Sequence, residues 1–153
     1  MSDRINIHGT GLVLDGVGII LRGPSGAGKS LLALELLDAT EARGKKSGLI
    51  ADDRLDVAVE KGKLVAYAPA QIGGMIELRG RGIVNRPHKA SAPIDLVIDL
   101  VDELVRQVEE DALITEIEGV ELARCPIPNR GIVDSNHQKL LINEALRALK
   151  KTP

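Results

Sequence analysis

Eight consecutive residues have the types and spacing that bind phosphate. They read Gly-Pro-Ser-Gly-Ala-Gly-Lys-Ser and match the pattern G-x-x-x-x-G-K-[ST] of phosphate loops. The glycines allow backbone N–H groups to approach phosphate oxygens, and a helix starting at the loop would turn its positive end to the same anion. Lys29 would reach the outer phosphates of ATP, while the Ser30 hydroxyl would bind Mg²⁺. The predicted nucleotide-binding residues are Gly23, Pro24, Ser25, Gly26, Ala27, Gly28, Lys29 and Ser30.

Acidic residues are the candidates for holding a metal and for accepting a proton. A magnesium-nucleotide site needs carboxylates near the loop, and the chain offers Asp52, Asp53, Glu77 and Asp99. The first two follow an apolar run, as in the second acidic motif of phosphate-loop proteins, whereas Asp99 is expected inside its strand. Neighbouring residues at a strand end point in different directions, so one carboxylate can orient the site while the other faces an incoming hydroxyl. The alternative is a polar turn without a chemical role.

Arginines and histidines give less specific indications. Arg79 and Arg81 lie in a glycine-punctuated stretch and can clamp phosphates or an acidic partner, although solvated arginines are the usual finding at such positions. A lone histidine such as His8 is more often structural than catalytic. The other histidines have no ligand-like spacing to His8 or to Cys125, so the residues predict no zinc site.

Short strands and few helices are expected around the loop. Asp15-Gly16 separates two apolar runs, which predicts a hairpin whose second strand leads into the phosphate loop. One helix is expected from the loop to about residues 39–44, and another after Asp134, which can cap it. Further strands are expected at 49–51, 55–59, 64–67 and 96–101. Residues 73–83 are too glycine-rich for a regular interior element and are expected to form a functional loop.

Composition restricts the class of protein. A length of 153 residues suits a single domain over 1–153, and strands with few helices indicate the α/β class with a mixed sheet. With one Tyr and no Phe or Trp, the core must be aliphatic, and base stacking on aromatic side chains is nearly excluded. A net charge of -2 supplies no basic field for nucleic acid. One cysteine, no secretion-signal pattern and no long apolar run predict a cytoplasmic protein without a membrane role.

Several segments taken together resemble one family. His8-Gly9 precedes the phosphate loop, Ala51-Asp52-Asp53 follows it, and residues 76–85 read Ile-Glu-Leu-Arg-Gly-Arg-Gly-Ile-Val-Asn. This order is similar to the C-terminal catalytic domain of bacterial HPr kinase/phosphorylase, and the last segment resembles that family's own signature. Without the N-terminal domain of the longer members, the chain resembles the short form found in alphaproteobacteria.

The resemblance implies a phosphate-loop kinase domain with a mixed, mainly β sheet. It implies a serine kinase that uses ATP and Mg²⁺ to phosphorylate HPr, the phosphocarrier of the sugar phosphotransferase system, and that assembles as a homo-hexamer. Catalytic roles are implied for His8, Lys29, Asp53 (the proton acceptor) and Arg106, and magnesium binding for Ser30 and Glu77. The substrate-facing and supporting residues that it implies are Asp52, Arg79, Gly80, Arg81, Gly82 and Arg130.

The sequence also leaves alternatives open. Leu31 stands where family members commonly have an acidic residue, and residues 127–131 replace a stretch associated with dephosphorylation. The reverse reaction, in which inorganic phosphate removes the serine phosphate, is therefore open. A small-molecule kinase with the same loop, and a nucleotide-binding regulatory module that transfers no phosphate, are the alternative functions.

Overall fold

The computed structural model describes residues 3–69 and 73–150, and a six-stranded sheet forms its centre. In spatial order its strands are β11 (Ile114–Ile117), β12 (Val120–Pro128), β10 (Leu96–Val101), β3 (Val17–Arg22), β2 (Thr10–Leu14) and β4 (Ser47–Ala51). β10 runs parallel to both β3 and β12, whereas β2, β4 and β11 run antiparallel to the strands they pair with. The mixed sheet expected from the sequence is therefore confirmed.

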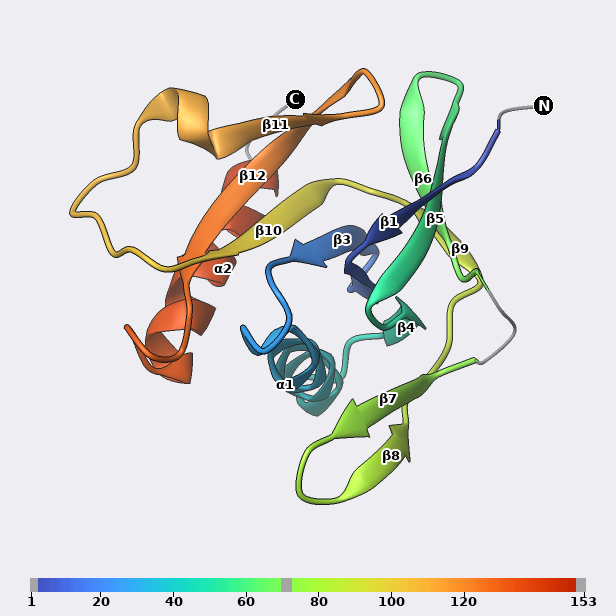
Figure 1. The fold of residues 1–153 in the computed structure, drawn as a ribbon, viewed down its shortest axis with the longest axis horizontal. Coiled ribbons are helices and arrows are strands. Elements are labelled where there is room, and N and C mark those ends of the chain that lie inside the picture. Colours follow the sequence, from blue (N-terminus) through green and yellow to red (C-terminus); the bar gives the residue numbers. More distant parts are fainter. Residues whose placement is uncertain (1–2, 70–72, 151–153) are drawn as a thin grey trace.

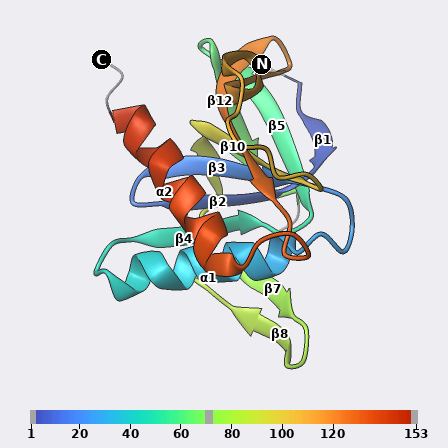
Figure 2. The same cartoon turned by 90° about the vertical axis from the view of Figure 1, so that its left-hand side faces the viewer.

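The helices cover one face of this sheet (Figures 1 and 2). α1 (Lys29–Ala42) follows the phosphate loop, and α2 (Ser135–Lys150) packs against β12. The expected cap of the second helix is present, because the His137 N–H donates to Asp134 Oδ1 at 2.9 Å. A buried cluster fills the space between helices and sheet; it includes Leu12, Leu21, Leu32, Leu37, Ile98, Ile127 and Ile142. Neither α-helix in the described part of the chain is long and apolar enough to cross a membrane.

A second sheet packs on the opposite face. Its strands are, in spatial order, β1 (Ile5–His8), β5 (Arg54–Glu60), β6 (Lys63–Tyr67) and β9 (Ser91–Pro93). The second buried cluster lies between the two sheets and includes Val13, Ile20, Leu55, Val57, Leu64, Val97 and Leu122. Successive residues of β3 alternate between the clusters, since side chains of a strand point to opposite faces. Both clusters consist mainly of aliphatic side chains, which confirms the expected aliphatic core.

The glycine-rich segment at residues 73–83 forms most of a hairpin, so the prediction of an irregular loop there was wrong. β7 (Met75–Leu78) pairs antiparallel with β8 (Gly82–Asn85), and the two strands project from the body of the molecule (Figure 1). Ile76 is 1% exposed and belongs to the cluster beneath the helices. Of the glycines that weigh against a strand, Gly73 and Gly74 precede β7, Gly80 lies in the turn at the hairpin tip, and Gly82 begins β8.

The remaining strand predictions are mostly confirmed, although several short elements went unrecognised. The hairpin around Asp15-Gly16 is formed by β2 and β3, and β4, β5, β6 and β10 lie where strands were expected. The elements without a prediction are β1, β9, β11, β12 and the 3₁₀ helix η1 (Glu110–Leu113). β1 and β9 are only four and three residues long, β9 and β12 contain prolines, and β1 pairs with a strand that is distant in sequence.

Gly18 sets the contact between β3 and the second sheet, and its replacement tests this packing. A Cβ atom at Gly18 would lie 1.9 Å from the Pro93 carbonyl oxygen, so backbone would have to move. We expect Gly18→Ala to lower the free energy of unfolding by more than about 3 kcal/mol. Gly16→Ala, at φ 82° with no atom nearby, should cost only about 1 kcal/mol. Urea denaturation of the two variants measures the difference, and equal losses would contradict this packing.

Candidate active site

The phosphate loop connects the end of β3 to the first turn of α1. Because β3 and β10 are parallel neighbours, the loop leaves the sheet at the edge where their carboxyl ends meet. Gly28 caps the helix with a φ of 96°, which a residue with a side chain rarely adopts, and no side chain caps the first turn. The N–H groups of that turn are thus free of side-chain acceptors. Lys29 is 7% exposed, and its Nζ donates to the Gly23 carbonyl at 2.7 Å, which holds the ammonium group over the loop.

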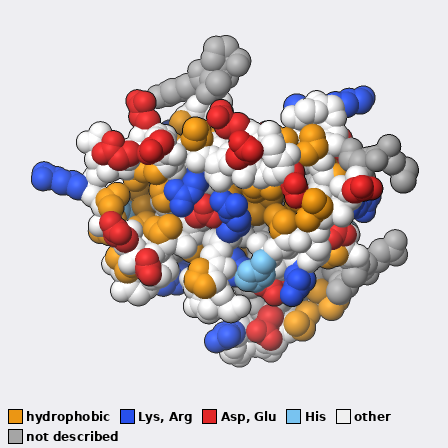
Figure 3. Space-filling model, turned by 45° about the horizontal axis from the view of Figure 1, so that its top comes forward, with side chains coloured by type: hydrophobic (Ala, Val, Ile, Leu, Met, Phe, Trp, Pro, Cys, Tyr) orange, Lys and Arg blue, Asp and Glu red, His pale blue; other side chains and the backbone are white. Residues whose placement is uncertain are grey.

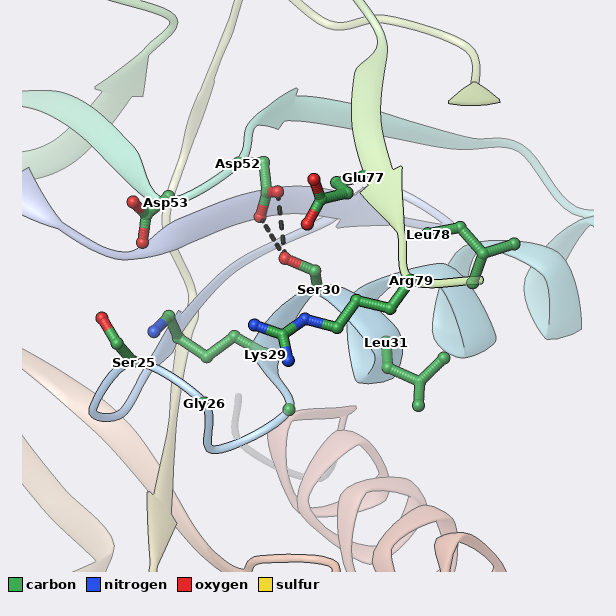
Figure 4. A pocket seen from close by; sticks show the side chains of 11 residues that line it. Ser25, Gly26, Lys29, Ser30, Leu31, Asp52, Asp53, Glu77, Leu78 and Arg79 are labelled. Carbon is green, nitrogen blue, oxygen red and sulfur yellow. Dashed lines mark hydrogen bonds between the residues drawn. The ribbon is translucent and has the colours of Figure 1, made fainter. Parts of the chain in front are cut away.

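Asp52 joins the end of β4 to the helix that starts at the loop. Ser30 Oγ lies 2.9 and 3.0 Å from the two Asp52 carboxylate oxygens, a contact drawn in Figure 4. Thr10, which is fully buried in β2, donates from its hydroxyl to Asp52 Oδ1 at 2.9 Å. The carboxylate is therefore held by one strand and itself holds the serine that the motif assigns to a metal.

Asp53 points the other way because its backbone turns sharply. Its φ is 72°, a left-handed conformation uncommon for a residue with a side chain. The Asp53 N–H donates to Thr10 Oγ1 at 3.1 Å, and its carbonyl accepts from the Gly9 N–H at 2.9 Å. The side chain then meets His8, whose Nε2 lies 2.6 Å from Asp53 Oδ1. The expectation that the adjacent carboxylates face different directions is confirmed.

These groups surround a pocket of about 480 Å³. It is lined by Ser25, Gly26, Gly28, Lys29, Ser30, Leu31, Asp52, Asp53, Glu77, Leu78 and Arg79. The hairpin contributes Glu77 and Arg79, because burial of Ile76 under the helix turns the next residue of the strand toward the pocket. In Figure 4, Glu77 lies beside Asp52, and Arg79 extends across the first turn of α1. Pockets of this size are common for small ligands.

Other predicted site residues lie outside this lining. Gly80, Arg81 and Gly82 are at the exposed tip of the hairpin. Arg106 is exposed in the connection between β10 and η1. Arg130 lies beside the loop: its side chain is 4.0 Å from where a Cβ of Gly28 would be, and it pairs with Glu35 of α1. Burial lowers the pKa of Arg130.

The donors on the pocket wall suit a hard cation. Ser30, Asp52 and Glu77 offer oxygen atoms only, as Mg²⁺ prefers. Among residues 3–69 and 73–150, no group of three or more His, Cys, Asp or Glu side chains is placed to hold a metal by itself. Phosphates and water would therefore have to complete the coordination, as is usual for magnesium bound with a nucleotide.

Thr10 is the site residue that the sequence did not indicate. Its hydroxyl donates to Asp52 and accepts from the Asp53 N–H, so one buried group supports both acids. The only signal in the chain is a threonine between Gly9 and Gly11 at the start of an apolar run. Such a pattern also fits an ordinary strand start, and only the approach of β4 to β2 reveals its function.

The strand, the glycine-rich loop, the buried lysine and the serine held by an aspartate define a phosphate-loop kinase fold with a mixed sheet. The model of the HPr serine kinase C-terminal domain matches residues 1–151. This chain belongs to that family, and the match extends well beyond Asn85, where the resemblance in the sequence became weaker.

Similar proteins agree with this assignment. An HPr kinase/phosphorylase from Aromatoleum aromaticum is 30% identical over 97% of this chain and 49% of its own length. One from Clostridium tetani is 39% identical over 57% of this chain and 27% of its own length. The solved HPr(Ser) kinase/phosphatase of Coxiella burnetii superposes with a TM-score of 0.71 at 25% identity, covering 94% of this chain and 98% of that one. The chain spans about half or less of the length of these curated relatives.

Substitution of Thr10 tests whether it supports the paired acids. Thr10→Val keeps the shape but removes the bonds to Asp52 and Asp53, so we expect a loss of about 1–3 kcal/mol in unfolding free energy. Affinity for magnesium-nucleotide should fall several-fold, because Asp52 is no longer fixed. Thr10→Ser retains the hydroxyl and should restore most of the affinity in calorimetric titrations. An unchanged affinity in Thr10→Val would refute this role.

Proposed function

We propose that this protein is an ATP-dependent kinase that phosphorylates a serine of HPr or a related phosphocarrier. The observation that carries the proposal is the His8–Asp53 pair at the rim of the pocket that Lys29 and Ser30 line. An acid oriented by a histidine beside a phosphate loop suits removal of a proton from an attacking hydroxyl. Membership in the family and the similarity to named HPr kinases support the same assignment.

In the proposed reaction, bound ATP with Mg²⁺ supplies the phosphoryl group and neutralises part of its charge. Lys29, held over the loop, places its positive charge against the outer phosphates. Asp53 accepts the proton of the serine hydroxyl at Oδ2, while Oδ1 stays bonded to His8, which fixes the carboxylate's orientation. Arg106 is proposed as a further active-site group, in accordance with the family resemblance.

For the metal we propose Ser30 and Glu77 as ligands, with Asp52 as the residue that holds Ser30. This division is supported by the short contacts between Ser30 Oγ and both Asp52 oxygens. The Glu77 side chain has no hydrogen bond or ion pair with the described residues, so its carboxylate is free to take a ligand. Asp52 would thus fix the position of Ser30, and Glu77 would bind the cation directly.

Exposure of the proposed base favours a protein acceptor over a small molecule. The side chains of His8 and Asp53 are 44% and 61% exposed, so a serine on a protein surface can reach them without a lid closing. A small-molecule kinase would be expected to enclose its acceptor and exclude water. A regulatory module without transfer would not require an acid oriented at the pocket rim. The acceptor would meet the hairpin tip, where Arg79, Gly80, Arg81 and Gly82 lie.

Further parts of the proposal concern assembly and reversal. We propose a cytoplasmic homo-hexamer in which α2 contributes to subunit contacts, because Leu140 on that helix is 66% exposed. The reverse reaction with inorganic phosphate would use Arg130, whose side chain lies beside Gly28 of the loop. The proposed partners are this phosphocarrier and further copies of the chain, with no role for nucleic acid or membrane.

The assignment of the base is tested by Asp53→Asn. The amide cannot accept the proton, so kcat for transfer from ATP to purified HPr should fall by about 10²- to 10⁴-fold. Nucleotide affinity should stay within about threefold, since Asp53 does not contact the loop. Asp56→Asn is the matched control, because Asp56 lies in the neighbouring strand β5 and its side chain accepts from Asn6 Nδ2, away from the pocket lining. Failure of the wild type to label any HPr-like carrier would refute the kinase, and normal rates in Asp53→Asn would refute the base.

Magnesium titration tests whether Glu77 is the metal ligand and Asp52 the residue that holds Ser30. Glu77→Gln should raise the magnesium concentration needed for nucleotide binding by about tenfold or more, with the protein's stability nearly unchanged. Asp52→Asn should reduce stability as well as magnesium dependence, because it weakens contacts to Ser30 and Thr10. The reverse pattern, with Glu77→Gln silent, would make Asp52 the direct ligand.

A further inference from the structure

Three charged side chains meet beside the phosphate loop, on the sheet face opposite α1. Arg22 is the last residue of β3, directly before Gly23, and Asp99 lies within β10. Arg22 Nε and Nη2 donate to the two Asp99 carboxylate oxygens at 2.7 and 2.8 Å, in a bidentate pair. Arg124 of β12 donates from Nε to Asp99 Oδ2 at 2.5 Å. One carboxylate thus ties the three strands together, from the carboxyl end of β3 to the middle of β12.

This cluster is ionised and largely shielded from water. The Asp99 side chain is 14% exposed, and burial by itself would raise its pKa. The hydrogen bonds and charges of Arg22 and Arg124 outweigh that effect, so the pKa of Asp99 is lowered. On the face seen in Figure 3, Lys and Arg side chains near the centre likewise lie beside acidic ones, so they form no continuous basic patch on this face.

Both arginines also reach the segment that returns from β10 to β11. Arg124 Nη1 donates to the Ala112 carbonyl at 2.9 Å, and Arg22 Nη2 lies 3.3 Å from Thr115 Oγ1. Planar guanidinium groups can make such divergent bonds at once, whereas an ammonium group cannot hold the same two directions. Arg22 and Arg124 therefore connect the end of β3, where the phosphate loop begins, to η1 and β11.

Residues 102–112 depend on this connection. Nearly all of them are exposed, and they include Arg106, the arginine proposed for the active site. Within the described parts of the chain, the bond from Arg124 to Ala112 is the hydrogen bond that joins residues 102–112 to another element. Loss of a single guanidinium would leave the segment attached only at its ends and by side-chain packing.

We infer that Asp99 is a positioning residue: through Arg124 and Arg22 it fixes residues 102–112, and with them Arg106, relative to the phosphate loop. The importance of Asp99 for phosphoryl transfer rests on the proposed function, whereas its effect on residues 102–112 does not. Asp99 touches neither the pocket lining nor the His8–Asp53 pair. Its removal should therefore loosen the acceptor side of the site while the nucleotide side stays intact.

The structural half of the inference is tested by the mobility of the segment. Arg124→Lys keeps a charge near Asp99 but cannot also reach Ala112, and Asp99→Asn removes the charge that orients both arginines. Amide hydrogen exchange in residues 102–112 should become at least about tenfold faster in both variants, and trypsin should cut faster after Arg106. Glu144→Gln, which breaks the exposed pair with Arg147 on α2, is the control and should change neither. Unchanged exchange in Arg124→Lys would overturn the inference.

The functional half is tested by separating acceptor use from nucleotide binding. In both variants, kcat/KM for HPr should fall by about tenfold or more, while the Kd for magnesium-nucleotide stays within about twofold. A variant that is merely less stable would lose kcat/KM and nucleotide-binding capacity together, in proportion to its unfolded fraction. If the wild type does not phosphorylate HPr, the proposed function fails, and the exchange experiment still decides the inference. Faster exchange with unchanged kcat/KM would show that the segment is fixed for another purpose.

Discussion

The candidate active site depends on a hydrogen-bonded chain from Thr10 through Asp52 to Ser30. It links β2, the end of β4 and the first turn of α1, three segments that are separate in sequence. Asp52 is only partly buried, but both of its oxygens are bonded, which compensates for the loss of water around the carboxylate. With that acid fixed, the serine at the helix start and the turn to Asp53 are fixed as well.

The same chain explains how two adjacent acids can take different roles. The left-handed backbone at Asp53 is maintained by bonds from Thr10 and Gly9 and sends its side chain to His8. Such a conformation costs about 1–3 kcal/mol and persists where the surroundings determine it. Here it separates Asp52, directed at the loop, from Asp53, directed at the rim of the pocket, so the proposed nucleotide and acceptor sides come from one turn.

The sheet places these parts at one edge. Parallel pairing of β3 with β10 and of β10 with β12 brings three carboxyl ends together, and each of these strands contributes to the site or its support. The Asp99 cluster ties these three strands together, while the hairpin places Glu77 in the same pocket lining as the loop. Buried aliphatic clusters on both faces of the sheet hold this edge in place, even though the described core contains no aromatic ring.

The sequence by itself determined the phosphate loop, the first hairpin, both helices and the paired acids, because each is specified by residues close together in the chain. It also indicated the family, through the order of several such short motifs. Residues 73–83 were misjudged, since the burial of Ile76 under α1 outweighs the low strand preference of the glycines around it. Only the tertiary structure decided that Asp52 holds Ser30, that Thr10 supports both acids, and that Asp99 binds Arg22 and Arg124. These contacts join residues from different strands and helices, and their geometry exists only once the sheet has brought those elements together.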